Sequence, residues 1–111
     1  MEAKIIKTPE LSSIIMDIQL TLSHNPGPVK RVGVFGSLVN GRFTDNSDID
    51  IAIEYEPGDD FDFNRFARFC EICEYITEFI SNSYGRKVDL VHVEERSGCL
   101  LQDIREEVIW V

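Results

Sequence analysis

Cysteine, histidine and long apolar runs are scarce in this sequence. The three cysteines, Cys70, Cys73 and Cys99, are an odd number for a disulfide framework, and no further cysteine or histidine pair completes a zinc site with the first two. We interpret them as reduced thiols that pack as small hydrophobic residues. No run of about 18 apolar residues is present, so we expect no membrane-spanning helix and no membrane partner. Residues 1–25 lack the basic and then apolar pattern of a signal peptide, which predicts a cytoplasmic protein.

Positive charge is also scarce. The chain has 11 Lys and Arg against 20 Asp and Glu, a formal net charge of −9 at pH 7. A surface of this sign repels a phosphate backbone, so direct binding of nucleic acid is not expected. Metal ions, a cation-accompanied nucleotide or a basic protein suit it better. The length of 111 residues predicts one domain, residues 1–111, and 43% hydrophobic residues are enough for a folded core.

Apolar periodicity and turn residues divide the chain into helices and strands. Thr8 as the N-cap and Pro9 at the first helical position predict a helix whose apolar stripe ends at Leu22. The expected elements that follow are strands at 29–35, 48–53 and 87–93, a long helix from about 62 to 82, and a closing helix with a short extended end over 100–111.

Two carboxylates open the second predicted strand. Asp48 and Asp50 project to the same face of a strand, while Ile49 and Ile51 point the other way, into the core. Two like charges this close repel each other, which raises one pKa unless a cation lies between them. Carboxylate oxygens suit Mg²⁺ or Mn²⁺, with water and phosphate completing the coordination. The pair therefore predicts a divalent metal site.

A third carboxylate, Asp89, lies between Val88 and Leu90 in the third predicted strand, where burying it unpaired would be costly. If this strand pairs with the second, Asp89 joins the same cluster. Two cations could then hold the attacking and the leaving oxygen of a phosphoryl displacement. Asp89 would also be placed to take the proton from an attacking hydroxyl.

A Gly36-Ser37 turn follows the first predicted strand and precedes a short segment, Leu38 to Asn40, that we expect to be helical. Gly36 lets the backbone approach a ligand closely. Ser37 presents a hydroxyl and an N–H at a helix N-terminus, where phosphate is favoured. Phosphates held there, beside paired metal-binding acids, describe a site for a nucleoside triphosphate.

The order of these motifs resembles the signature of the polymerase-β-like nucleotidyltransferase superfamily: Gly36-Ser37, ten residues, then Asp48-x-Asp50. The sequence is most similar to the small stand-alone members, the minimal nucleotidyltransferase (MNT) proteins. Further matches to the family pattern are Gly41, Ser47, Lys87–Leu90 and Ile104–Val108. The resemblance implies an α+β fold, a small mixed β-sheet with helices packed on one side.

The resemblance also implies a metal-dependent transfer of a nucleoside monophosphate, expected to be AMP from ATP, to a hydroxyl group. Asp48 and Asp50 would hold two Mg²⁺ ions, with Mn²⁺ as an alternative. Asp89 would complete the metal site and act as the base. Gly36 and Ser37 would hold the triphosphate.

The basic residues for the triphosphate are less clearly marked. Many relatives carry Arg or Lys where Asn40 stands, and Arg42 is near enough to supply that phosphate contact. We interpret Arg65, Arg68 and Arg86 as surface charges, with the alternative that one of them helps to hold the triphosphate.

The acceptor is expected on another molecule, because larger superfamily members use a second domain to bind it and 111 residues leave no space for one. Similar small proteins pair with a HEPN-type RNase toxin, as antitoxins that AMPylate a toxin tyrosine or bind the toxin directly. One alternative is a non-catalytic subunit that neutralises a partner by contact. Another is a small-molecule nucleotidyltransferase, of the antibiotic-modifying sort, working as a homo-oligomer. Trp110 either docks the tail or marks a partner surface.

Overall fold

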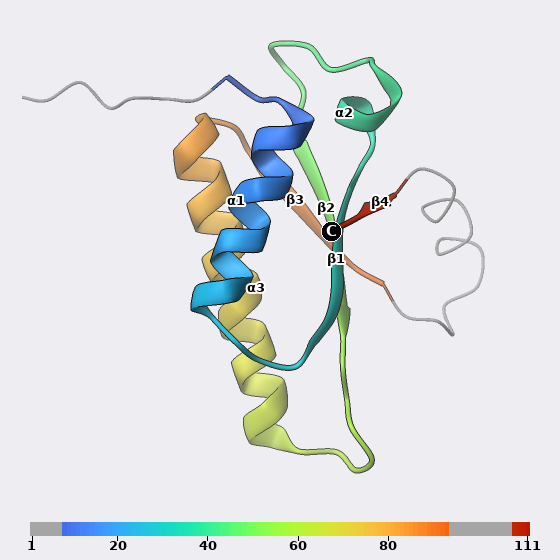
Figure 1. The fold of residues 1–111 in the computed structure, drawn as a ribbon, viewed down its shortest axis with the longest axis vertical. Coiled ribbons are helices and arrows are strands. Elements are labelled where there is room, and N and C mark those ends of the chain that lie inside the picture. The colour runs from blue at the N-terminus through green and yellow to red at the C-terminus, as the bar shows by residue number, and fades with distance from the viewer. Residues whose placement is uncertain (1–7, 94–107) are drawn as a thin grey trace, which may run out of the picture.

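A mixed four-stranded sheet organises the fold in the computed structural model, which describes residues 8–93 and 108–111 (Figure 1). The strands are β1 (Val29–Phe35), β2 (Ile49–Tyr55), β3 (Val88–His92) and β4 (Ile109–Trp110). Their order in the sheet is β3-β2-β1-β4. β1 pairs antiparallel with β2 and with β4, whereas β2 and β3 are parallel.

Two long helices, α1 (Leu11–His24) and α3 (Phe63–Tyr84), lie side by side on one face of this sheet (Figure 1). A single helical turn, α2 (Ser37–Asn40), follows β1. This arrangement confirms the expected α+β class, a small mixed sheet with its long helices on one side. Among the described residues, no helix is long and apolar enough to span a membrane.

The core lies between the two long helices and the sheet. Ile49, Ile51 and Ile53 alternate along β2 toward the helices and are fully buried. The helices add Ile14, Ile18, Phe69, Ile72, Ile76 and Ile80 to the same cluster. Burying one such side chain contributes roughly 1.5–3 kcal/mol. Because side chains alternate along a strand, Asp50 and Ala52 lie on the opposite face of the sheet.

The start of α1 differs from the prediction. Its N-cap is Glu10, which is extended and makes no hydrogen bond from its side chain. The first helical hydrogen bond runs from Ile14 N to Glu10 O at 3.0 Å. The prediction of Thr8 as the N-cap and Pro9 as the first helical residue was therefore wrong. Packing explains the difference, since Leu11 is packed against the core whereas Thr8 is exposed.

The end of α3 lies two residues beyond the predicted end. Tyr84, in the last turn, is buried, and its hydroxyl donates to Asp17 Oδ2 of α1 at 2.5 Å. Burial, with Asp17 beside it, raises the pKa of Tyr84. Gly85 then ends the helix in the left-handed conformation, at φ 61°. A contact between residues far apart in sequence thus extends the helix to Tyr84.

The C-terminal strand β4 docks against β1. Gly33 makes this possible, because a Cβ there would lie 2.9 Å from Trp110 Cε3 and would overlap Val108 Cγ1. Arg31 lies over the Trp110 ring, 4.0 Å from its centre. Trp110 therefore docks the tail, and the expected extended end is confirmed. The closing helix predicted from residue 100 falls outside the described residues.

The cysteines of α3 are free thiols, as predicted. Cys73 is buried among core side chains, and burial raises the pKa of its thiol to about 11. Such a thiol packs as a small hydrophobic residue and is a poor nucleophile at neutral pH. Cys99 lies outside the described residues.

Candidate active site

Gly36 brings the end of β1 against a carboxylate of β2. Its backbone has φ 76° and ψ −145°, a conformation that side chains disfavour. A Cβ at this position would overlap Asp50 Oδ2 and would lie 3.0 Å from Asp50 Cγ. Gly36 is therefore required both by the turn and by the space that Asp50 fills.

The three predicted carboxylates lie at one end of the β2–β3 pair. Asp50 faces Asp89 in the parallel register, and Asp48 immediately precedes β2. Burial, followed by the charges of Asp89 and then Asp48, raises the pKa of Asp50. Asp89 is exposed, so the expected cost of burying it does not arise. An exposed carboxylate beside Asp50 is accessible to an incoming acceptor.

The chemistry of these side chains fits a divalent cation. They supply hard oxygen donors, and burial, followed by the neighbouring negative charges, raises the pKa of Asp50, so a bound cation would favour its ionised form. In the arrangement that residues 8–93 and 108–111 adopt here, no three His, Cys, Asp or Glu side chains could hold a metal ion. Binding through three carboxylates would therefore require these side chains to move closer together.

The Gly36-Ser37 turn opens α2 as expected. Val39 N and Asn40 N both donate to Gly36 O at 3.0 Å. Arg42 N donates to Ser37 O and to Asn40 Oδ1, both at 3.0 Å. Asn40 thus closes the turn after α2, and the exposed Arg42 follows it.

Sequence reasoning missed the turn that leads into Asp48. Ser47 Oγ accepts from Thr44 N at 2.9 Å, and Ser47 N donates to Thr44 O at 3.1 Å. Asn46 N donates to Thr44 Oγ1 at 3.3 Å. The serine before Asp48 was the available signal, and its hydroxyl shapes the backbone just ahead of the carboxylates.

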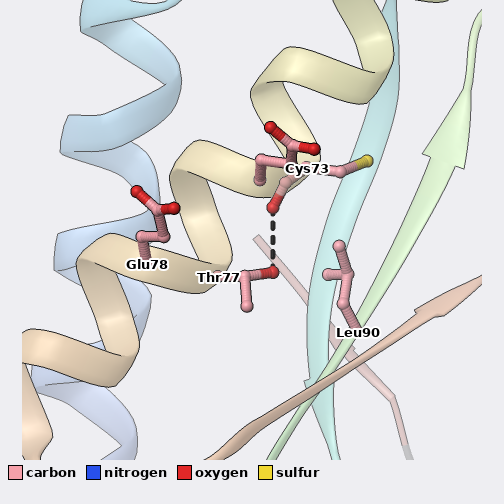
Figure 2. Close-up of a pocket in the computed structure, with 5 residues that line it drawn as sticks. Cys73, Thr77, Glu78 and Leu90 are labelled. Carbon is pink, nitrogen blue, oxygen red and sulfur yellow. Dashed lines mark hydrogen bonds between the residues drawn. The ribbon is translucent and has the colours of Figure 1, made fainter.

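A cleft of about 390 Å³ lies on the helix side of the sheet, between α3 and β3 (Figure 2). It is lined by Cys73, Glu74, Thr77, Glu78 and Leu90. Leu90 packs against the helix-side core, and side chains alternate along β3, so Asp89 points away from this cleft. His92 also lies on the helix side, with its ring 5.3 Å from that of Phe69. Neither the cleft nor His92 belongs to the carboxylate site.

The sequence matches a known family over most of its length. The family model described as "Polymerase beta, Nucleotidyltransferase" matches residues 16–111, which is most of the chain. The chain therefore belongs to the polymerase beta nucleotidyltransferase family, and it is a nucleotidyltransferase.

Its curated relatives include archaeal proteins named as protein adenylyltransferases. A Methanocaldococcus jannaschii protein, named as a candidate protein adenylyltransferase, is 36% identical over 84 residues. The match covers 75% of this chain and 77% of that protein. Protein adenylyltransferase MntA of Thermococcus cleftensis is 29% identical over 102 residues, which cover 92% of this chain and 93% of that protein.

Solved structures show the same fold. A candidate minimal nucleotidyltransferase gives a TM-score of 0.63 at 22% identity, over 91% of this chain and 95% of that one. A toxin–antitoxin complex with AMP-PNP gives a TM-score of 0.58 at 23% identity, over 88% of this chain and 69% of that one. A complex of a tri-AMPylated Shewanella oneidensis HEPN toxin with MNT antitoxin gives a TM-score of 0.56 at 20% identity, over 90% of this chain and 70% of that one.

Proposed function

We propose that this protein transfers AMP from ATP to a hydroxyl group of a partner protein in a metal-dependent reaction. The observation that carries the proposal is the placement of Asp50, which faces Asp89 in the strand register and lies against the Gly36 backbone. This placement puts a turn suited to phosphate directly beside carboxylates suited to divalent cations. Membership of the nucleotidyltransferase family supports the reaction type.

In the proposed reaction the acceptor oxygen attacks the α-phosphorus of ATP. The bond from that phosphorus to the bridging oxygen breaks, and pyrophosphate leaves with the bonding electron pair. Asp89, which is exposed, would take the proton from the acceptor hydroxyl. Gly36 would let the triphosphate approach the backbone, and Ser37 would bind it through its hydroxyl and N–H.

The remaining site residues would bind a phosphate group and the metal ions. Arg42 follows the Gly36-Ser37 turn and would contact a phosphate with its guanidinium. Asp48, Asp50 and Asp89 would hold two Mg²⁺ ions, or Mn²⁺ in their place. When bound, these ions would neutralise the charge that develops on the phosphate oxygens.

The proposed acceptor is a tyrosine of a HEPN-type toxin, which makes this protein the antitoxin of the pair. The name of the Thermococcus relative and the AMPylated toxin in the Shewanella complex support this choice. The net charge of −9 adds an electrostatic argument, because a protein that binds RNA presents basic surface to an acidic partner.

The test incubates the protein with ATP labelled at the α-phosphate, Mg²⁺ and the product of the neighbouring gene. Label on a tyrosine of that product is expected. Asp50→Asn should abolish labelling, whereas Asp59→Asn, which removes an exposed carboxylate elsewhere, should leave it intact. A tight complex without label would instead support neutralisation by contact. Label on neither protein, with transfer to a small hydroxyl compound, would support the alternative of a small-molecule nucleotidyltransferase.

A further inference from the structure

Arg86, which no motif includes, contacts the loop ahead of Asp48 at several points. Its Nη1 donates to Thr44 O at 2.9 Å and to Ser47 O at 3.3 Å. Its Nη2 lies 3.8 Å from Asp45 Oδ1, and its Cζ lies 4.9 Å from the centre of the Phe43 ring. Only 18% of the side chain is exposed. One guanidinium thus spans the loop from 43 to 47.

The two ends of this contact are themselves held in place. Thr44 O, which accepts from Arg86, also accepts from Ser47 N and so closes the turn. On the other side, the left-handed Gly85 ends α3, and Arg86 N donates to Ser81 O at 3.3 Å. The guanidinium therefore joins the end of a packed helix to the turn whose next residue is Asp48.

We propose that Arg86 is a positioning residue that fixes the backbone presenting Asp48 to the metal site. The inference rests on the proposed function, since Asp48 matters only if the carboxylates hold the cations. Its contacts favour this role over binding of the triphosphate, because the guanidinium is already directed at two carbonyl oxygens of the loop. Both of these hydrogen bonds come from Nη1, while Nη2 lies near Asp45 and the guanidinium carbon lies over the Phe43 ring. A planar guanidinium can make all of these contacts at once, whereas an ammonium presents a single point charge.

The experiment measures amide hydrogen exchange in metal-free protein, alongside Mn²⁺ binding and steady-state kinetics. Arg86→Met should speed exchange of the peptide covering residues 43–49 by roughly 10- to 100-fold, because two charge-assisted hydrogen bonds are lost. It should weaken Mn²⁺ binding by about tenfold or more. Arg86→Lys is a milder change, included in case the first variant folds poorly. It should alter both the exchange rate and Mn²⁺ binding less than Arg86→Met does. Arg68→Met removes an arginine whose side chain is 40% exposed and pairs with Glu71 three residues along the same helix, and it should change neither.

Two results would overturn the inference. The first is unchanged exchange over residues 43–49 in Arg86→Met. The second is unchanged Mn²⁺ binding in the same variant. If exchange and Mn²⁺ binding are both unchanged and the KM for ATP is raised, Arg86 is instead a ligand of the triphosphate. Exchange and Mn²⁺ binding need no turnover, so a wild-type protein that fails to transfer AMP would refute the proposed function while these two readouts still decide the role of Arg86.

Discussion

Replacing Gly36 with alanine tests the close contact between β1 and the carboxylate site. The new Cβ would lie 3.0 Å from Asp50 Cγ and 3.3 Å from Asp50 Cβ, and would overlap Oδ2. The backbone conformation alone costs roughly 1–3 kcal/mol for a residue other than glycine. Displacing the packed carboxylate adds about 1–3 kcal/mol. Gly36→Ala should therefore lower the free energy of unfolding by about 2–6 kcal/mol.

Gly58→Ala is the matched control. Gly58 also has a positive φ, 73°, but the nearest atom to its added Cβ, Arg65 Nε, lies 3.8 Å away. This variant should lose only the roughly 1–3 kcal/mol of backbone strain and should keep its activity. Introducing Gly36→Ala into an Asp50→Ala background should bring its cost down toward the same value, because the carboxylate it displaces is gone.

Urea denaturation gives the free energies of unfolding, and AMP transfer per folded molecule gives the activity. Gly36→Ala should lose most of its activity, since the displaced carboxylate is a proposed metal ligand. The reasoning is refuted if Gly36→Ala and Gly58→Ala lose equal stability and Gly36→Ala stays active.

Three further predictions concern the carboxylates and the packing of the ends. Burial and neighbouring charges raise the pKa of Asp50 in the folded state. Ionisation of Asp50 therefore lowers the free energy of unfolding as the pH rises through that pKa. In metal-free buffer Asp50→Asn should match or exceed the wild-type Tm at pH 7, with any gain vanishing below about pH 4; a lower Tm at pH 7 would contradict this. Tyr84→Phe removes the hydroxyl that donates to Asp17 and should cost about 1–3 kcal/mol in urea denaturation, so a loss within experimental error would argue against that contact. Gly33→Ala should displace β4 and shift the emission of Trp110, the sole tryptophan, to longer wavelength; an unchanged spectrum would count against the docking.

Local patterns predicted the elements and motifs whose cause is local. The β-branched residues of 29–35 predicted a strand with the observed bounds. Alternation also separated Asp50 from the core-facing isoleucines of β2. Periodicity found both long helices, although their ends depended on packing.

Contacts between distant parts of the chain could not be predicted in this way. Tyr84 extends α3 because it reaches Asp17, which is 67 residues away in sequence. Arg86 reaches Thr44 across 42 residues, and nothing around it in the sequence marks that target. The loop ahead of Asp48 is thus shaped by a residue that sequence analysis assigned to the surface.

The central claim is nucleotidyl transfer from the carboxylate site, and the position of the transferred phosphorus tests it most directly. The protein, its partner and Mg²⁺ are incubated in parallel with ATP labelled at the α-phosphate and with ATP labelled at the γ-phosphate. We expect label on the partner only from the α-labelled ATP, release of the γ-label as pyrophosphate, and neither product from Asp50→Asn. Label on the partner from the γ-phosphate, or α-label transfer that persists in Asp50→Asn, would contradict the account.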